Sequence, residues 1–300
     1  MAESILSTSQ FNLPNHMATG VFQKIQDTSA VARLCGQTPL LFGTTQFMTF
    51  TGQPRAEFVG EGVEKSPATT EFKPVTAVPH KAQVTVRFSN EVEYADADYQ
   101  LSCLSALSDS LTVGLSRALD LGAIHGINPL TGAKATTITD AIISSASTTT
   151  ASGDPEKDIE TASGTVIGNG YVPTGLAIDP LYAWDFKTAK YEDGRKKYPE
   201  LSMNIKNAQA IEGLVTAVSD TVSALKEAST ATNVKAVVGQ WDAFKWGVQR
   251  EIPVTKITAG DPDGLGDLNR QNQIALRAEV IYGWAVLDPT AFQVIKGASA

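Results

Sequence analysis

The chain has 300 residues, which is enough for one large domain or two smaller ones. Its net charge is −8, and an acidic chain gains nothing from releasing DNA counterions, so the charge argues against a protein that binds duplex DNA directly. Residues 1–20 show neither the basic leader nor the apolar stretch of a secretory signal, and no apolar run reaches the roughly 18 residues of a membrane span.

The N-terminal segment, residues 1–45, is expected to be an arm and a lead-in to the folded body. Residues 1–19 are polar, weakly periodic and interrupted by Asn12, Pro14 and Asn15. Such a segment needs another surface to order it. Apolar residues at helical spacing predict one short helix over residues 19–34.

A long β excursion follows. Gln46–Thr51 is predicted to be a strand, and Lys81–Val92 alternates apolar and polar residues as a half-buried strand does. The residues between them are rich in Gly and Pro, which indicates turns. Because a two-stranded ribbon is marginally stable alone, it must lie on its own domain or on another subunit.

The clearest helix is predicted over Asp96–His125. Asp96 or Asp98 is expected to cap its start, and Gly126 its end. The helix would be about 40 Å long or more. Its apolar face is defined by leucines at helical spacing, namely Leu101, Leu104, Leu111, Leu115 and Leu119. Gly114 inside it predicts a bend or a close contact, because Gly costs about 1 kcal/mol relative to Ala in a helix.

The remainder alternates helices and strands. Residues 128–153 are rich in Ser, Thr, Ala and Gly and are expected to be loop. Helices are predicted at Pro155–Val166 and Pro180–Lys190. Strands are predicted at Thr174–Ile178, Leu214–Val218, Asn233–Val238, Ile252–Ile257 and Ile274–Val286.

No constellation of catalytic residues is found, so no catalytic residue, cofactor or metal ligand is assigned. Gly164–Gly170 has the glycines of a phosphate loop, but it lies between a predicted helix and strand, where a turn is expected. The three histidines, His16, His80 and His125, are scattered and match no zinc pattern. Cys35 and Cys103 are too few for a disulfide framework, and reduced thiols fit the cytoplasm.

Two clusters rich in acidic residues are candidate functional sites. Asp261, Asp263 and Asp267 resemble a calcium loop, but the glycine and the final glutamate of that motif are misplaced. A turn is the preferred interpretation, with loose Ca²⁺ binding left open. The second cluster lies in the excursion, where acid/base work is less favoured than contact between subunits or plain solvation; its members are Arg55, Glu57, Glu61, Glu64 and Lys65.

Three segments carry a family resemblance. The strongest is the C-terminal sequence IALRAEVIYGWAVLDPTAFQVI at Ile274–Ile295, preceded by RQNQ. The others are GLAIDPLYAWDFKTAKYEDGR at Gly175–Arg195 and GQWDAFKWGVQREIPV at Gly239–Val254. In this order they resemble the major capsid proteins of tailed bacteriophages, with the Hong Kong 97-type fold. The matching positions of the last strand are Ala275, Arg277, Glu279, Gly283, Ala285, Val286, Asp288, Pro289, Ala291 and Phe292.

The resemblance implies an α+β fold and a division of the chain. Residues 46–79 would be an extended loop over a neighbouring subunit. Residues 80–127 and 259–300 would form a discontinuous peripheral domain with a spine helix over about 96–125. Residues 128–258 would form an axial α/β domain.

The resemblance also implies a structural protein rather than an enzyme. Many copies would assemble as pentamers and hexamers into an icosahedral shell around double-stranded DNA, without reading its sequence. The short arm implies that scaffolding is a separate protein or that none is used, with a separate scaffolding protein preferred. A portal is expected, and no cross-link between the loops of subunits is expected. The protein would lie in the virion after assembly in the host cytoplasm. The alternatives left open are an encapsulin-type compartment, a hydrolase with an unseen site, and a tail or decoration protein.

Overall fold

The computed structural model describes residues 29–51, 56–62, 64–67, 71–99, 103–201 and 203–298. These residues form two β-sheets. The first is antiparallel and has the strand order β1-β2-β9-β8, with β1 at Thr45–Thr51, β2 at Glu71–Ser89, β9 at Gln273–Val286 and β8 at Phe244–Ile257. The second is mixed and has the order β3-β10-β7-β4-β6-β5.

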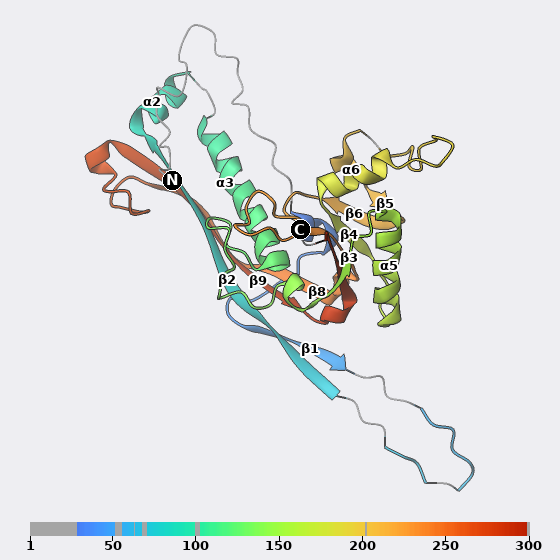
Figure 1. Cartoon of the computed structure of the whole chain (residues 1–300). Helices are drawn as coiled ribbons and strands as arrows, with labels where there is room; N and C mark the ends of the chain where they lie inside the picture. The colour runs from blue at the N-terminus through green and yellow to red at the C-terminus, as the bar shows by residue number, and fades with distance from the viewer. Residues whose placement is uncertain are drawn as a thin grey trace.

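Strand β2 serves two structures at once. Its first part, Glu71–Ala77, pairs with β1 to form a hairpin, and its second part, Val78–Ser89, pairs with β9 inside the sheet. The hairpin therefore grows directly out of the sheet, and Figure 1 shows it extending away from the rest of the molecule. The predicted strand at Gln46–Thr51 is confirmed, whereas the predicted strand at Lys81–Val92 begins earlier and ends at Ser89.

The two prolines of β2 explain why its first half was predicted to be turns. Pro74 pairs with Met48 of β1, and Pro79 pairs with Gly283 of β9. In each place β2 has one neighbour, because the β1 pairing ends where the β9 pairing begins. A proline is tolerated in a strand where its missing N–H faces no partner. The prolines therefore lie on either side of the change of neighbour, where β2 has one partner strand, and do not break the strand.

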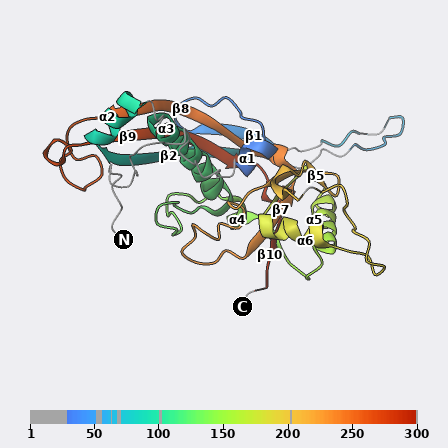
Figure 2. The same cartoon turned by 90° about the horizontal axis from the view of Figure 1, so that it is seen from above.

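The predicted long helix is divided in the structure. Helix α2 occupies Asn90–Tyr99, and helix α3 begins at Cys103 and ends at Asp120. Asp96 and Asp98 therefore lie inside α2 and do not cap the start of the long helix, which corrects that prediction. Residues 100–102, between the two helices, lie outside the described part of the chain. Figures 1 and 2 show α3 lying across the four-stranded sheet.

The C-terminal end of α3 changes to a π-helical turn at Leu121–His125. Gly126 ends it in the left-handed conformation, with φ of 68°, and its N–H donates to the carbonyls of Gly122 and Leu121. The predicted stop at Gly126 is thus confirmed. Gly122 lets the turn approach the sheet, since a Cβ there would lie 2.9 Å from the Trp284 ring. At Gly114 a Cβ would make only an ordinary contact, 3.5 Å from Val84.

The six-stranded sheet carries the smaller unit, on the side of Figure 2 where α5 and α6 lie. Its strands are β3 at Ser147–Thr150, β10 at Phe292–Lys296, β7 at Val234–Gly239, β4 at Gly175–Ile178, β6 at Leu214–Val218 and β5 at Ala210–Ile211. The helices are α1 at Ala30–Leu34, α4 at Ile142–Ser145, α5 at Pro155–Gly168 and α6 at Pro180–Thr188.

An Asp-Pro pair starts each of the two main helices of this unit. The Asp154 side chain accepts from Glu156 N–H before α5, and the Asp179 side chain accepts from Leu181 N–H before α6. An acidic N-cap followed by proline is the expected beginning of a helix. Both helices, and the strands at β4, β6, β7 and β9, agree with the predicted elements to within a few residues.

The strand pairing differs from the predicted segments in two places. β8 begins at Phe244, well before the predicted Ile252, and pairs with β9 in the four-stranded sheet. Strand β10, where the sequence predicts no strand, pairs with β7 and β3 in the six-stranded sheet. The largest buried apolar cluster joins the two sheets, and its bulkiest members are Trp241, Phe244, Trp246, Tyr282, Trp284 and Phe292.

Candidate assembly surfaces

The tip of the hairpin holds the charged residues predicted to contact another subunit. Glu57, Glu61, Glu64 and Lys65 are exposed, and Arg55 lies outside the described residues. In the described part of this segment, Ser66 N–H donates to a Glu57 oxygen at 2.6 Å. The structure places the four side chains on one solvent-exposed segment without an apolar pocket of their own chain, so their role in contact between subunits stays a prediction.

Large apolar side chains accompany these charges and were missed in the sequence. Phe58 at the tip is fully exposed, and Met48 and Phe72 on the paired strands of the hairpin are 61% and 56% exposed. Met48 pairs with Pro74, so its side chain and that of Phe72 lie on the same face of the hairpin. Residues 72–78 show no regular alternation of apolar and polar residues, and the Gly and Pro content of the excursion indicated turns. The hairpin therefore presents apolar surface that its own chain leaves in water.

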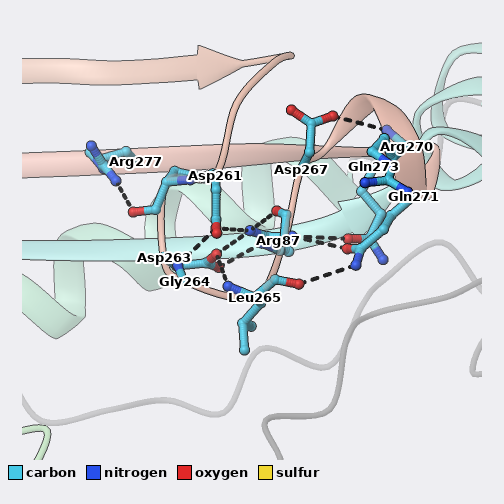
Figure 3. A network of polar contacts seen from close by, with 12 residues as sticks. Arg87, Asp261, Asp263, Gly264, Leu265, Asp267, Arg270, Gln271, Gln273 and Arg277 are labelled. Carbon is cyan, nitrogen blue, oxygen red and sulfur yellow. Dashed lines mark hydrogen bonds and ion pairs between the residues drawn. The ribbon is translucent and has the colours of Figure 1, made fainter.

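The acidic loop after β8 holds an arginine (Figure 3). The side chain of Arg87, on β2, is 2% exposed. Its Nε donates to Asp263 at 2.7 Å, and its Nη2 donates to Asp261 at 2.9 Å and to the Gly266 carbonyl at 2.8 Å. Gln271 accepts from Nη1 at 3.1 Å. Burial works to raise the pKa of Asp261, but backbone N–H groups and Arg87 together hold it below its ordinary value.

This arrangement gives the loop a cation supplied by the protein itself. The turn predicted at residues 260–269 is present, and the guanidinium lies among the oxygens that a calcium ion would have used. Among the residues that the structure describes, no group of three or more His, Cys, Asp or Glu side chains is placed to hold a metal ion.

A second buried charge, Asp120, joins three segments. One oxygen accepts from Ser29 Oγ at 2.6 Å and from Val31 N–H at 3.1 Å. The other accepts from Ala30 N–H at 2.8 Å and from Thr221 Oγ1 at 2.7 Å. Burial raises the pKa of Asp120, against the effect of these four hydrogen bonds. The carboxyl group ties the start of α1 to the end of α3 and to the loop after β6.

A third buried acid, Asp158, belongs to a Ser-Asp-Tyr chain that looks like a catalytic set. The hydroxyl groups of Ser152 and Tyr182 both donate to it, at 2.6 Å and 2.7 Å, and Asp158 itself is 2% exposed. Ser152 N–H donates to the same carboxyl oxygen. Both carboxylate oxygens of Asp158 accept hydrogen bonds within the fold. Asp158 therefore connects the start of α5 to α6 and stabilises their packing.

The histidines lie apart from one another, as their spacing predicted. His80 stacks on Trp284 with ring centroids 4.2 Å apart, His125 is buried beside Thr221 and Val222, and His16 lies outside the described residues. Residues 164–168 belong to α5 and the turn itself is confined to Asn169 and Gly170, so the predicted turn at Gly164–Gly170 is confirmed only at its C-terminal end. Burial raises the pKa of the Cys35 thiol to about 11, which keeps it protonated.

His125 makes the stability of the fold depend on pH. Burial lowers the pKa of His125 from 6.5 to about 4, so the unfolded chain takes up a proton before the folded chain does. The stabilising contribution is complete above pH 6.5 and is lost as the pH falls toward 4, by about 3 kcal/mol. We expect His125→Gln, which retains a donor for the two carbonyls, to show a shallower decline over this window in urea titrations. Equal slopes would contradict this.

The described residues contain no helix that is both long and apolar enough to cross a membrane. What they do contain is a long helix on a four-stranded antiparallel sheet, a hairpin extending from that sheet, and a smaller mixed sheet with its own helices. This combination defines the Hong Kong 97-type fold of phage shell proteins.

Comparison with known proteins agrees with the fold. The model of the phage capsid family matches residues 10–297. A chain from Mycobacterium phage Ogopogo is 44% identical, with a TM-score of 0.85 and coverage of 98% of this chain and 100% of that one. A chain from Gordonia phage Cozz is 30% identical, with a TM-score of 0.83 and coverage of 96% and 92%. A search of curated sequences found no significant match.

The chain belongs to the phage capsid family. It is thus a structural protein of a bacteriophage virion, a major capsid protein, and the resemblance carried by the three sequence segments is confirmed. A chain from the capsid of an empty GTA particle is 12% identical with a TM-score of 0.68, which shows the shared fold alone.

Proposed function

We propose that copies of this chain assemble as pentamers and hexamers into an icosahedral shell that encloses double-stranded DNA. Assembly would take place in the host cytoplasm, around a separate scaffolding protein and with a portal at one vertex. The shell would hold DNA without reading its sequence, because an acidic wall with a net charge of −8 per subunit disfavours tight binding to phosphates.

The observation that carries this proposal is the hairpin of β1 and β2. It extends from the sheet with Met48, Phe72 and Phe58 in water. A two-stranded ribbon is marginal alone, and contiguous exposed apolar surface marks an interaction site. A neighbouring subunit supplies the missing layer, with Arg55, Glu57, Glu61, Glu64 and Lys65 forming charge pairs across the contact.

The tip of the hairpin can be removed while β1 and β2 stay paired. Thr51 pairs directly with Glu71, so replacing residues 52–70 with Asn-Gly closes the two strands with a tight turn. We expect this variant to remain folded, with an unchanged thermal midpoint, and to form no shells. The full-length chain, expressed alone and with its scaffolding protein, should form closed particles in size exclusion and negative-stain microscopy.

The outcomes separate the alternatives. Shells formed by the shortened variant would contradict the role of the charged tip of the hairpin. A full-length chain that stays monomeric under both conditions would contradict the shell itself. Particles that contain a co-purifying enzyme and no DNA, when taken from infected cells, would favour an encapsulin-type compartment, although similarity to chains from phages supports the DNA-filled shell.

A further inference from the structure

The lead-in before β1 crosses the four-stranded sheet through a notch made by two glycines. Gly247 of β8 and Gly283 of β9 pair directly with each other. A Cβ on Gly247 would lie 2.1 Å from the Thr38 carbonyl oxygen, and one on Gly283 would lie 3.0 Å from Leu40. Thr38 N–H donates to the Trp246 carbonyl at 2.8 Å, which fixes the crossing. The backbone thus lies directly on the sheet.

This crossing lies on the face of the sheet opposite α3. The side chains of Tyr282 and Trp284 point toward the helix, since Tyr282 donates to the Leu115 carbonyl and Trp284 contacts Gly122. Gly283 lies between them in β9, so it faces the other side. The lead-in is therefore separated by the whole sheet from the surface that α3 covers.

One side chain clamps the end of the crossing. Gly43 N–H donates to Gln249 Oε1 at 3.2 Å, and Gln249 Nε2 donates to the Gly43 carbonyl at 2.7 Å. Leu40, on the other side of the turn, is 9% exposed. Between these two anchors Leu41 is 86% exposed and Phe42 is 70% exposed. Two large apolar side chains are thus held in water by a turn that is fixed at both ends.

The composition of this segment points to the kind of surface that covers it. The chain carries no charged residue between Arg33 and Arg55. An ordinary solvent-exposed segment carries Lys, Glu, Asp or Arg, whereas the centre of a protein interface is depleted in charges and enriched in Phe and Met. A second copy is itself acidic, with a net charge of −8, so an uncharged contact avoids both repulsion and the desolvation of charges.

We propose that the turn at Leu40–Gly43 docks Leu41 and Phe42 onto a second copy of this chain, as a contact separate from the hairpin. The inference rests on the proposed shell. Because the turn is fixed before contact, docking loses little conformational entropy. A small apolar contact can therefore add measurably to the affinity between subunits. The partner surface belongs to a neighbouring copy and has no nucleic acid or membrane component.

The test compares two double variants at the same positions. Leu41→Ser/Phe42→Ser removes the apolar groups, and Leu41→Met/Phe42→Leu retains them. Since both side chains are in water in the single chain, we expect equal thermal midpoints for both variants and the natural chain. We expect the serine variant to need a subunit concentration about tenfold higher or more before shells form, and the conservative variant to assemble normally.

A photo-crosslinker at position 42 identifies the occupant. Cross-linked peptides from a second copy of the chain, found in purified particles, are the expected result. Peptides from the scaffolding protein or from another virion protein would overturn the proposal, as would normal assembly by the serine variant. If the natural chain forms no shells, the proposed function fails first; if it forms shells and position 42 cross-links only within its own chain, only the docking contact fails.

Discussion

Replacing Arg87 with methionine is expected to lower the free energy of unfolding by about 2–3 kcal/mol, because it removes the buried hydrogen bonds of the guanidinium to two partly exposed carboxylates and a carbonyl. The guanidinium is almost fully buried and donates to Asp261, Asp263 and the carbonyl of Gly266. Methionine preserves most of the packed volume and none of the donors. Urea denaturation measures the loss, and amide exchange should show the loop at residues 258–272 opening first.

A matched control exists on the surface. Arg195 pairs with Asp193, but its side chain is 81% exposed. Such a pair contributes about 0–1 kcal/mol, so Arg195→Met should leave stability nearly unchanged. In the Arg87→Met background, Asp261→Asn with Asp263→Asn should recover part of the loss, since no charges then remain uncompensated. If Arg87→Met is as mild as Arg195→Met, the loop does not depend on the guanidinium.

The elements that the sequence predicted well are those with local signals. Helices α5 and α6 begin at Asp-Pro pairs, and β4, β6 and β7 are short apolar runs bounded by turn residues. These signals lie within a few residues of the element that they define, so no knowledge of the fold is needed to use them. The start of β9 at Gln273, after the turn at Asn272, belongs to the same group.

The elements that were missed depend on neighbours far away in the chain. β2 continues through Pro74, which pairs with β1, and Pro79, which pairs with β9, and it changes partner between Ala77 and Val78. The first part of β8 alternates in sequence, with Phe244, Trp246 and Val248 apolar, but Gly247 weakens the local strand signal, and only the backbone of Thr38 lying against it explains why glycine is needed there. Local periodicity cannot report either fact, since both are set by what lies on the strand from another part of the chain.

The same reasoning applies to the sites. The exposed charges at the tip of the hairpin could be predicted because a Gly-rich ribbon without a core must be exposed. Arg87 and Asp261 are 174 residues apart, and Leu41 and Phe42 are exposed only because Gln249 and the two glycines hold the lead-in in place. One observable signal for the latter was the absence of charge between Arg33 and Arg55.

Asp120→Ala is expected to lower the free energy of unfolding by about 4 kcal/mol, since it leaves four buried donors without an acceptor. Two of them, the N–H groups of Ala30 and Val31, cannot turn toward another partner. Asp120→Asn should also destabilise, because its amide hydrogens would face one or more of these donors. Asp109 lies exposed on the same helix, so Asp109→Ala is the control and should change stability by less than about 0.5 kcal/mol.

The location of the loss distinguishes this clamp from general destabilisation. Because Asp120 holds residues 29–31 against the end of α3, amide exchange in Asp120→Ala should accelerate first in α1 and in the loop around Thr221. The four-stranded sheet, which the carboxyl group does not contact, should keep its protection until global unfolding. Uniform acceleration over α1 and β9 alike would show that Asp120 stabilises the whole core and does not secure the N-terminal lead-in. Faster amide exchange confined to α1 would show that Asp120 holds α1 in place. Asp120 would then fix the start of the segment that leads to the Leu41–Phe42 turn.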